Sequence, residues 1–329
     1  MRFFFKFLSA FLLVSNIVFA DEIATRSPQT SRKPIIVTSI NPIYQIALAI
    51  TQDKINTFLI INPSFSEHDY QLKKTDVEFV NKADLIFYVS DDLENNFLKL
   101  VTSYNKKDQA FELIRISELN ILQKRNDTKK IDPHIWLNPR NGLKIAQLIT
   151  QKISEIDPVN SVKYQKNLEK FTKEVLLTKK AIQIHLEGVR NINNQGYIFY
   201  HDGYQYFEDY FDVRPLKVIA YNHNSELTVG AMKEIDALIK SNQVKCIFGE
   251  PQDEKNSAMK LAQNYKIKFA ILDLIGTKEN HDKKSNGYSI LLMNISDDMV
   301  ACDMATISRT VFNNKKSKLC PQNKKTIIL

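Results

Sequence analysis

Three of the six histidines in the chain share a context that favours metal binding. His68 follows the β-rich run 57–61 by a short loop, and His201 comes directly after the run 197–200. His134 lies in the sequence DPHIW, beside the only tryptophan. Ligands of an open α/β sheet bind outside the carboxyl ends of its strands, so we expect these imidazoles to meet there. Imidazole suits Zn²⁺ in tetrahedral geometry.

A carboxylate is expected to complete this site as a fourth ligand. Asp273 follows the apolar run 268–272 and so occupies the same kind of position as His201, although it could instead cap a helix or a loop. Glu67, next to His68, is the alternative fourth ligand. Neighbouring acids could also orient the imidazoles through hydrogen bonds. These acids are Glu67, Asp69, Asp132 and Asp202.

The other three histidines are expected to be ordinary polar residues. His185 falls in a helical stretch, and His223 and His281 fall in polar loops. The sequence also lacks the signatures of nucleotide-binding loops, dinucleotide sites, serine hydrolases and H-E-x-x-H zinc proteases. No catalytic residues are therefore predicted, and the chain is not expected to be an enzyme.

Strands alternate with helices along most of the chain, a pattern typical of βαβ units around a parallel sheet. In the first half we expect strands at 35–39, 57–61 and 84–90, with helices at 41–51, 91–104 and 141–156. Thr75 and Glu78 have the spacing of a capping box before a further helix. In the second half we expect strands at 197–200, 217–221, 245–248 and 268–272, with helices at 203–211, 228–240, 253–265 and from 287 onward.

One long helix is expected between the two halves. The segment 157–190 has no glycine or proline between Pro158 and Gly188, and Asp157 can cap its start. A helix of about 30 residues would be about 45 Å long, far above the usual length. Such a helix can span two lobes.

The predicted architecture is therefore α/β, with two lobes, each a parallel sheet flanked by helices, joined by one long rigid helix. The lobes would occupy 34–156 and 191–312, with the linking helix at 157–190. Because a continuous helix offers few hinge residues, we expect metal release without wide opening of the lobes. It would come from loops near His201 and Asp273, which are expected to be held mainly by local contacts.

Both ends of the chain are expected to lie outside these lobes. Residues 1–20 have the pattern of a signal peptide, in which Arg2 and Lys6 accompany an apolar run of roughly a dozen residues that ends in the sequence VFA. The alternative is an anchor helix, for which this run is short. Residues 21–33 are polar and expected to be flexible, and residues 313–329 form a basic tail. The predicted location is the periplasm.

The composition is that of a soluble globular protein, with 43% hydrophobic and 25% charged residues. This excludes a polytopic membrane protein. The formal net charge of +8 falls to +6 when residues 1–20, with two positive charges and no acids, are removed. So modest a charge is weak evidence for a nucleic-acid partner, and none is expected.

In an oxidising compartment two of the three cysteines (Cys246, Cys302 and Cys320) are expected to pair.

A resemblance to a known family rests on five short sequences. They are EHDY at 67–70, DPHIWL at 132–137, YHDGY at 200–204, FGEPQ at 248–252 and LDLIG at 272–276. In this order, and from about Ile35 to Cys302, the chain resembles the metal-binding receptors of bacterial zinc and manganese ABC importers. The resemblance implies two α/β lobes joined by a rigid helix, and the permease and ATPase subunits of an importer as partners. We expect a monomer.

The resemblance also implies the ligands and the cargo. The matching positions are His68, His134 and His201 for the histidines, Asp273 for the carboxylate, and Glu67 for a nearby or substituting acid of some zinc members. Manganese members tend to have a carboxylate where this chain has His201, so three imidazoles favour Zn²⁺. The resemblance further implies a disulfide between Cys246 and Cys302.

Several positions depart from the family's pattern. The charged segment 117–131, which we expect to be an exposed loop, has no histidine, whereas many zinc members carry a loop rich in His and Asp. Asn138 and Leu274 stand where Asp and Pro are usual, and the tail with Cys320 has no counterpart. The predicted function is a high-affinity periplasmic zinc receptor that delivers Zn²⁺ to an ABC importer. The alternatives are a manganese or iron receptor of the same fold, a metal-dependent adhesin, and a secreted zinc hydrolase with an open coordination position.

Overall fold

The computed structural model describes residues 32–68, 70–94, 97–187, 196–221, 228–253, 256–277 and 286–304. The expected signal peptide, nearly all of the polar N-terminal segment and the basic tail with Cys320 lie outside these residues. Residues from Lys33 onward group as one unit by their contacts. Among the described residues, no helix has both the length and the apolar character that crossing a membrane requires.

The first lobe contains a four-stranded parallel sheet in the order β2-β1-β3-β4. Its strands are β1 (Ile35–Thr38), β2 (Asn56–Leu59), β3 (Leu85–Tyr88) and β4 (Ala110–Glu112). Its helices are α1 (Asn41–Thr51), α2 (Lys74–Lys82) and α3 (Phe97–Ser103), with short 3₁₀ turns at Lys107–Gln109 and Leu113–Arg115. Pro42 occupies the first turn of α1, where its missing N–H costs no hydrogen bond.

The second lobe repeats this arrangement with the strand order β10-β9-β7-β8, again all parallel. Its strands are β7 (Gly196–His201), β8 (Lys217–Ala220), β9 (Val244–Gly249) and β10 (Lys268–Ile271). Its helices are α6 (Gln205–Phe211), α7 (Val229–Lys240) and α8 (Ser257–Tyr265). Side chains of β7 alternate between two cores, with Tyr197 and Phe199 in the larger one and Ile198 and Tyr200 in the smaller.

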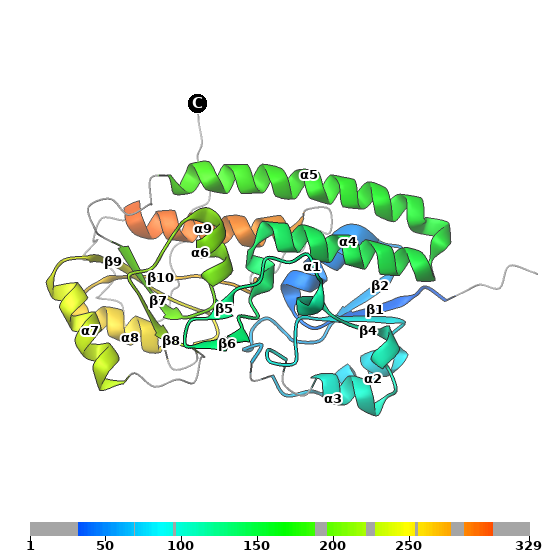
Figure 1. Ribbon diagram of the computed structural model, residues 1–329, viewed down its shortest axis with the longest axis horizontal. Helices are drawn as coiled ribbons and strands as arrows, with labels where there is room; N and C mark the ends of the chain where they lie inside the picture. Colours follow the sequence, from blue (N-terminus) through cyan, green and yellow to red (C-terminus); the bar gives the residue numbers. More distant parts are fainter. Residues whose placement is uncertain are drawn as a thin grey trace, which may run out of the picture. The chain divides into compact units, whose positions relative to one another are not determined.

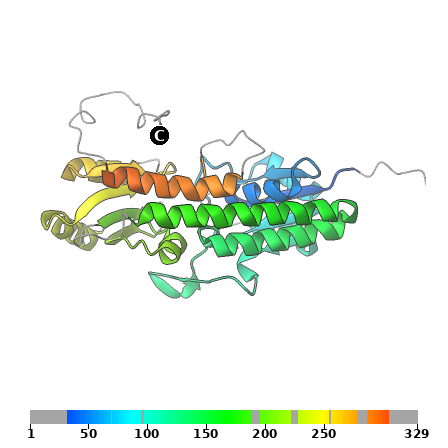
Figure 2. The ribbon, with the colours of Figure 1, turned by 90° about the horizontal axis from the view of Figure 1, so that it is seen from above.

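A layer of three long helices lies beside these sheets (Figures 1 and 2). They are α4 (Pro139–Ile156), α5 (Ser161–Leu186) and α9 (Gly287–Met304). Helix α5 contacts both α4 and α9, and also α1 of the first lobe and α6 of the second. Its buried face repeats at intervals of seven and four residues, through Tyr164, Phe171, Val175, Ile182 and Leu186. The two parallel sheets and the long helix confirm the predicted fold class; the exact domain boundaries stay predictions.

The long helix was predicted at 157–190 but begins at Ser161, and residues 188–190 lie outside the described residues. Its 26 residues correspond to about 39 Å, and a separate 3₁₀ turn precedes it at Pro158–Asn160. The Asp157 carboxylate accepts hydrogen bonds from Tyr164 Oη (2.5 Å) and Asn160 Nδ2 (2.8 Å). Asp157 therefore anchors the turn instead of capping the helix.

Two predictions for the first lobe were wrong in detail. The helix predicted at 91–104 begins only at Phe97, because the Glu94 carboxylate accepts the N–H groups of Val89 and Ser90 and holds the chain in a turn. Helix α2 is capped by Asp76, whose carboxylate accepts the Lys73 N–H at 2.7 Å, and not by the predicted box of Thr75 and Glu78. Strand β4 was not predicted at all.

The segment 117–131 also differs from the predicted loop. It contains an antiparallel hairpin of β5 (Gln123–Lys124) and β6 (Asp127–Ile131). The chain then passes through a 3₁₀ turn, Ile135–Leu137, into α4, where the side chain of Asn138 accepts the N–H of Arg140. Asn138 thus serves as the helix cap at a position where the related family usually has Asp.

The predicted disulfide between Cys246 and Cys302 is present. It joins β9 to the end of α9, and both cysteines are buried. The bond therefore ties the last helix of the described chain to a central strand of the second sheet.

Candidate metal centre

Three histidines from separate elements meet between the two lobes. His201 is the last residue of β7, at the carboxyl end of the second sheet. His134 immediately precedes the 3₁₀ turn that leads into α4, and His68 lies in the loop between β2 and α2. The convergence predicted from the sequence is therefore what the structure has.

The three rings are close enough to share one ion. Their ligand atoms all lie within 4.8 Å of one another. The ring centroids are 5.6 Å apart for His68 and His134, 5.7 Å for His68 and His201, and 5.3 Å for His134 and His201. Zn–N bonds of about 2.0–2.1 Å in a tetrahedron put neighbouring nitrogens roughly 3.4 Å apart, so a small convergence of the rings would complete the geometry.

Carboxylates orient two of these imidazoles. Nδ1 of His134 lies 2.7 Å from Oδ1 of Asp132, which also accepts the backbone N–H of His134 at 3.0 Å. Nδ1 of His201 lies 3.0 Å from Oε1 of Glu250, at the end of the neighbouring strand. In the tautomer with the proton on Nδ1, each carboxylate fixes the ring and leaves the Nε2 lone pair for a metal.

A glycine allows the His201 ring to lie where it does. A Cβ atom at Gly203 would stand 2.6 Å from Cδ2 of Leu274 and 3.0 Å from Nδ1 of His201. Both contacts are closer than van der Waals packing permits. A side chain at this position would therefore displace either the histidine or the loop after β10.

The environments of the two most buried histidines push their pKa values apart. Burial lowers the pKa of His134, but the charges of Asp132 and Glu67 and the hydrogen bond with Asp132 outweigh it and raise the pKa to about 10. For His201, burial and the neighbouring His134 charge lower the pKa to about 3, against the opposing charges of Glu67 and Asp132. These opposite shifts favour the protonated imidazole at His134 and the neutral imidazole at His201.

The two candidate carboxylates are placed differently. Glu67 is only 1% exposed, and its Oε1 lies 3.7 Å from Nε2 of both His68 and His134. The Asp273 carboxylate instead accepts the N–H groups of Gly276 (2.7 Å) and Thr277 (2.5 Å), as well as the Thr277 hydroxyl (2.6 Å). Asp273 thus makes the loop-capping contacts that were the alternative reading of its position.

The other residues singled out in the sequence have separate surroundings. Asp202 forms an ion pair with Arg125 of the hairpin. His185, on α5, lies 3.2 Å from Oδ1 of Asp297 and 3.3 Å from Oγ of Ser296, so it links two helices. Asp69, His223 and His281 lie outside the described residues.

Sequence reasoning gave Glu250 no role, although the residue stands in one of the family-like sequences. Its position at the end of β9, next to the strand that carries His201, was the available signal. Arg125 had no such signal, because its partners are more than 70 residues away in the sequence.

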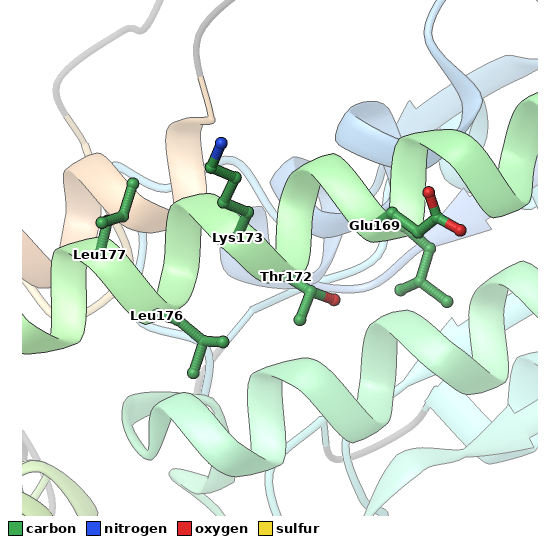
Figure 3. A pocket seen from close by; sticks show the side chains of 6 residues that line it. Glu169, Thr172, Lys173, Leu176 and Leu177 are labelled. Carbon is green, nitrogen blue, oxygen red and sulfur yellow. The ribbon is translucent and has the colours of Figure 1, made fainter.

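A surface groove lies on α5 (Figure 3). Side chains of this one helix line it, namely Leu168, Glu169, Thr172, Lys173, Leu176 and Leu177. None of these is a histidine or a cysteine, and the groove offers a metal only one carboxylate. The candidate metal centre is therefore the histidine cluster.

Comparisons with known proteins agree with this geometry. Residues 36–302 match the family model described as zinc-uptake complex component A, periplasmic. The high-affinity zinc uptake system protein ZnuA of Yersinia pestis is 27% identical over 324 residues, which cover 90% of this chain and 98% of that protein. A metal ABC transporter substrate-binding lipoprotein of Lactococcus lactis is 28% identical over 300 residues, covering 88% and 95%.

A solved structure shares the fold. The crystal structure of a ZnuA protein matches with a TM-score of 0.70 at 18% identity and covers 82% of this chain and 99% of that one. The family model spans most of the chain and includes all three clustered histidines. The chain therefore belongs to the family of the periplasmic zinc-uptake complex component A.

Proposed function

We propose that this protein is a periplasmic receptor that binds one Zn²⁺ ion and delivers it to the permease and ATPase subunits of an ABC importer. The observation that carries the proposal is the cluster of three imidazoles, with ligand atoms within 4.8 Å of one another. Two of the three rings are held by carboxylates, as in protein metal sites.

The chemistry of the ligand set favours zinc over manganese. Imidazole nitrogen suits Zn²⁺, whereas Mn²⁺ prefers carboxylate, carbonyl and water oxygens. With His68, His134 and His201 as ligands, at most one position of a tetrahedral shell is left for oxygen. A manganese or iron receptor would be expected to replace at least one of these imidazoles by a carboxylate.

We further propose Glu67 as the fourth ligand. Its Oε1 is already 3.7 Å from two of the imidazole nitrogens, and its carboxylate balances the charge of the ion in a buried site. Asp273 would first have to give up hydrogen bonds to Gly276 and Thr277. These contacts support Glu67 over Asp273, which was the first choice from the sequence.

A receptor fits this site better than a hydrolase does. A catalytic zinc keeps one coordination position open for water, whereas four protein ligands close the shell. The periplasmic location rests on the signal-peptide pattern of residues 1–20, and the disulfide of Cys246 and Cys302 suits an oxidising compartment.

The test is a metal competition on the chain from residue 21 onward. The protein is stripped with a chelator, offered equimolar Zn²⁺ and Mn²⁺, desalted and analysed by native mass spectrometry with elemental analysis. The expected result is one zinc ion per chain and no manganese. Retention of manganese in preference to zinc would overturn the assignment of the cargo, and retention of neither ion would overturn the receptor function.

A further inference from the structure

The hairpin of β5 and β6 belongs to the first lobe but is bonded to the second. Arg125, at its tip, forms ion pairs with Asp202 and with Glu208 of α6. The arginine side chain is 28% exposed, whereas the two carboxylates are 7% and 2% exposed. One guanidinium therefore compensates two acids that the fold has largely removed from water.

Neutral hydrogen bonds surround this ion cluster. The backbone N–H of Leu122 donates to the Tyr206 hydroxyl at 3.0 Å, and that hydroxyl donates to the carbonyl of Asp132 at 2.9 Å. The side-chain amide of Gln205 donates to the carbonyl of Gln123 at 2.8 Å. The hairpin is thus bonded to the first two residues of α6 as well as to Glu208.

On both lobes, the residues of this ion cluster are connected through the chain to the candidate metal centre. On the first-lobe side, β6 runs directly into Asp132, whose carboxylate holds the His134 ring. On the second-lobe side, Asp202 follows His201 in the chain. The ion cluster therefore spans the gap between the two segments that carry these histidines.

Resting on the function proposed above, we propose that Arg125 is a positioning residue that holds the His134 and His201 segments together and thereby slows metal release. The geometry of a guanidinium suits this role, because its planar fork can bind two carboxylates at once. Loss of Arg125 removes the ion pairs that join the hairpin to Asp202 and Glu208 and leaves these two largely buried carboxylates without this partner, so α6 is held less firmly to the hairpin.

The test compares zinc dissociation from the wild-type chain, Arg125→Met and Arg125→Lys, each loaded with one Zn²⁺ and mixed rapidly with excess chelator. Supporting residues of metal sites typically contribute 10- to 100-fold to metal affinity, so Arg125→Met should raise the dissociation rate by about that factor. The dissociation rate of Arg125→Lys should lie between those of the wild type and Arg125→Met, because lysine keeps the charge but not the planar fork of the guanidinium. The association rate should change little.

Arg115→Met is the matched control. Arg115 also pairs with a carboxylate, Glu112, but the Arg115 side chain is 76% exposed and the pair lies wholly within the first lobe. Zinc should leave this variant at the wild-type rate. A role in stability alone would lower the denaturation midpoint of Arg125→Met without changing the dissociation rate from the folded protein. A dissociation rate within twofold of wild type would overturn the proposal.

Hydrogen exchange of the metal-free proteins separates this idea from the receptor function. Amides of 127–131 and of α6 should exchange faster in Arg125→Met than in Arg115→Met. If the wild-type chain bound no zinc, the proposed function would fail. Equal rates of amide exchange in Arg125→Met and Arg115→Met would refute the positioning role of Arg125, whether or not zinc binds. If Arg125→Met does not fold, Glu208→Gln and Arg125→Lys decide in its place by the same two measurements.

Discussion

The buried Glu94 carboxyl should make the free energy of unfolding depend on pH. Burial raises the pKa of this carboxyl from 4.5 to about 7, against the lowering effect of the hydrogen bonds from the N–H groups of Val89 and Ser90. The native state therefore binds a proton that the unfolded chain releases between these two values. Because the native state holds more protons in this range, its stability must fall as the pH rises from 4.5 through 7.

Glutamine in place of Glu94 removes this dependence, since its amide does not titrate. A rise of the pKa from 4.5 to about 7 corresponds to about 3 kcal/mol of stability in total, of which about 2.5 kcal/mol is lost between pH 5 and pH 8. The amide can accept only one of the two backbone hydrogen bonds from Val89 and Ser90. That cost is the same at every pH, so it cancels when each protein is compared with itself at the two pH values.

The assay is urea unfolding at pH 5 and pH 8 in the presence of a chelator. From pH 5 to pH 8 the wild-type free energy of unfolding should fall by about 2.5 kcal/mol relative to Glu94→Gln. The control is Glu169→Gln on the exposed side of α5, which should follow the wild type at both pH values. If Glu94→Gln and the wild type changed in parallel, the buried carboxyl would be ionised throughout and the reasoning would be wrong.

Three further outcomes are expected. In a chelator competition, His134→Ala should bind zinc at least about 100-fold more weakly, since it removes one of about four bonds, whereas His185→Ala should match the wild type; equal affinities would refute the site. Glu67→Gln should weaken zinc binding by about 10-fold or more, whereas Asp273→Asn should mainly lower the thermal midpoint; the reverse pattern would make Asp273 the fourth ligand. Cys302→Ala opens a disulfide between residues 56 apart and should cost about 4 kcal/mol in urea unfolding, so an unchanged midpoint would contradict that value.

The strands and the long helices could be predicted because their signals are local. Every residue of β3 and β7 is buried, and both strands appear in the sequence as short apolar runs. Helix α5 carries its apolar residues at a helical period. Residues 91–94 have a helical composition too, but the Val89 N–H donates a hydrogen bond to the Glu94 carboxylate, which favours a turn. Whether this segment forms a turn or a helix depends on the burial of the Glu94 side chain, which cannot be read from the sequence.

The histidines of the site could be predicted from local signals, but their supporting contacts could not. His68, His134 and His201 could be found because strand ends and family-like sequences mark them. The pairing of Glu250 with His201 depends on which strands are neighbours, and β9 lies beside β7 although α6, β8 and α7 separate them in the chain. The role of Arg125 depends on how the two lobes are placed.

One expectation about movement was wrong in its premise. The loop after β10 is held by more than local contacts, because Nε1 of Trp136 donates to the Leu274 carbonyl at 2.8 Å. Nδ2 of Asn41 donates to the carbonyls of Ile275 and Gly276 at 3.0 and 2.8 Å. Both donors come from the first lobe. Release of the metal through this loop would therefore have to break bonds between the lobes.

Helix α9 has a consequence for how the chain reaches its native state. This helix is the last described element, yet it packs against α1 near the beginning of the chain, and its Tyr288 hydroxyl donates to the carbonyl of Trp136. Since α9 and α1 line the same core, that core is incomplete until α9 has been synthesised, and its formation depends on contacts between residues far apart in the sequence.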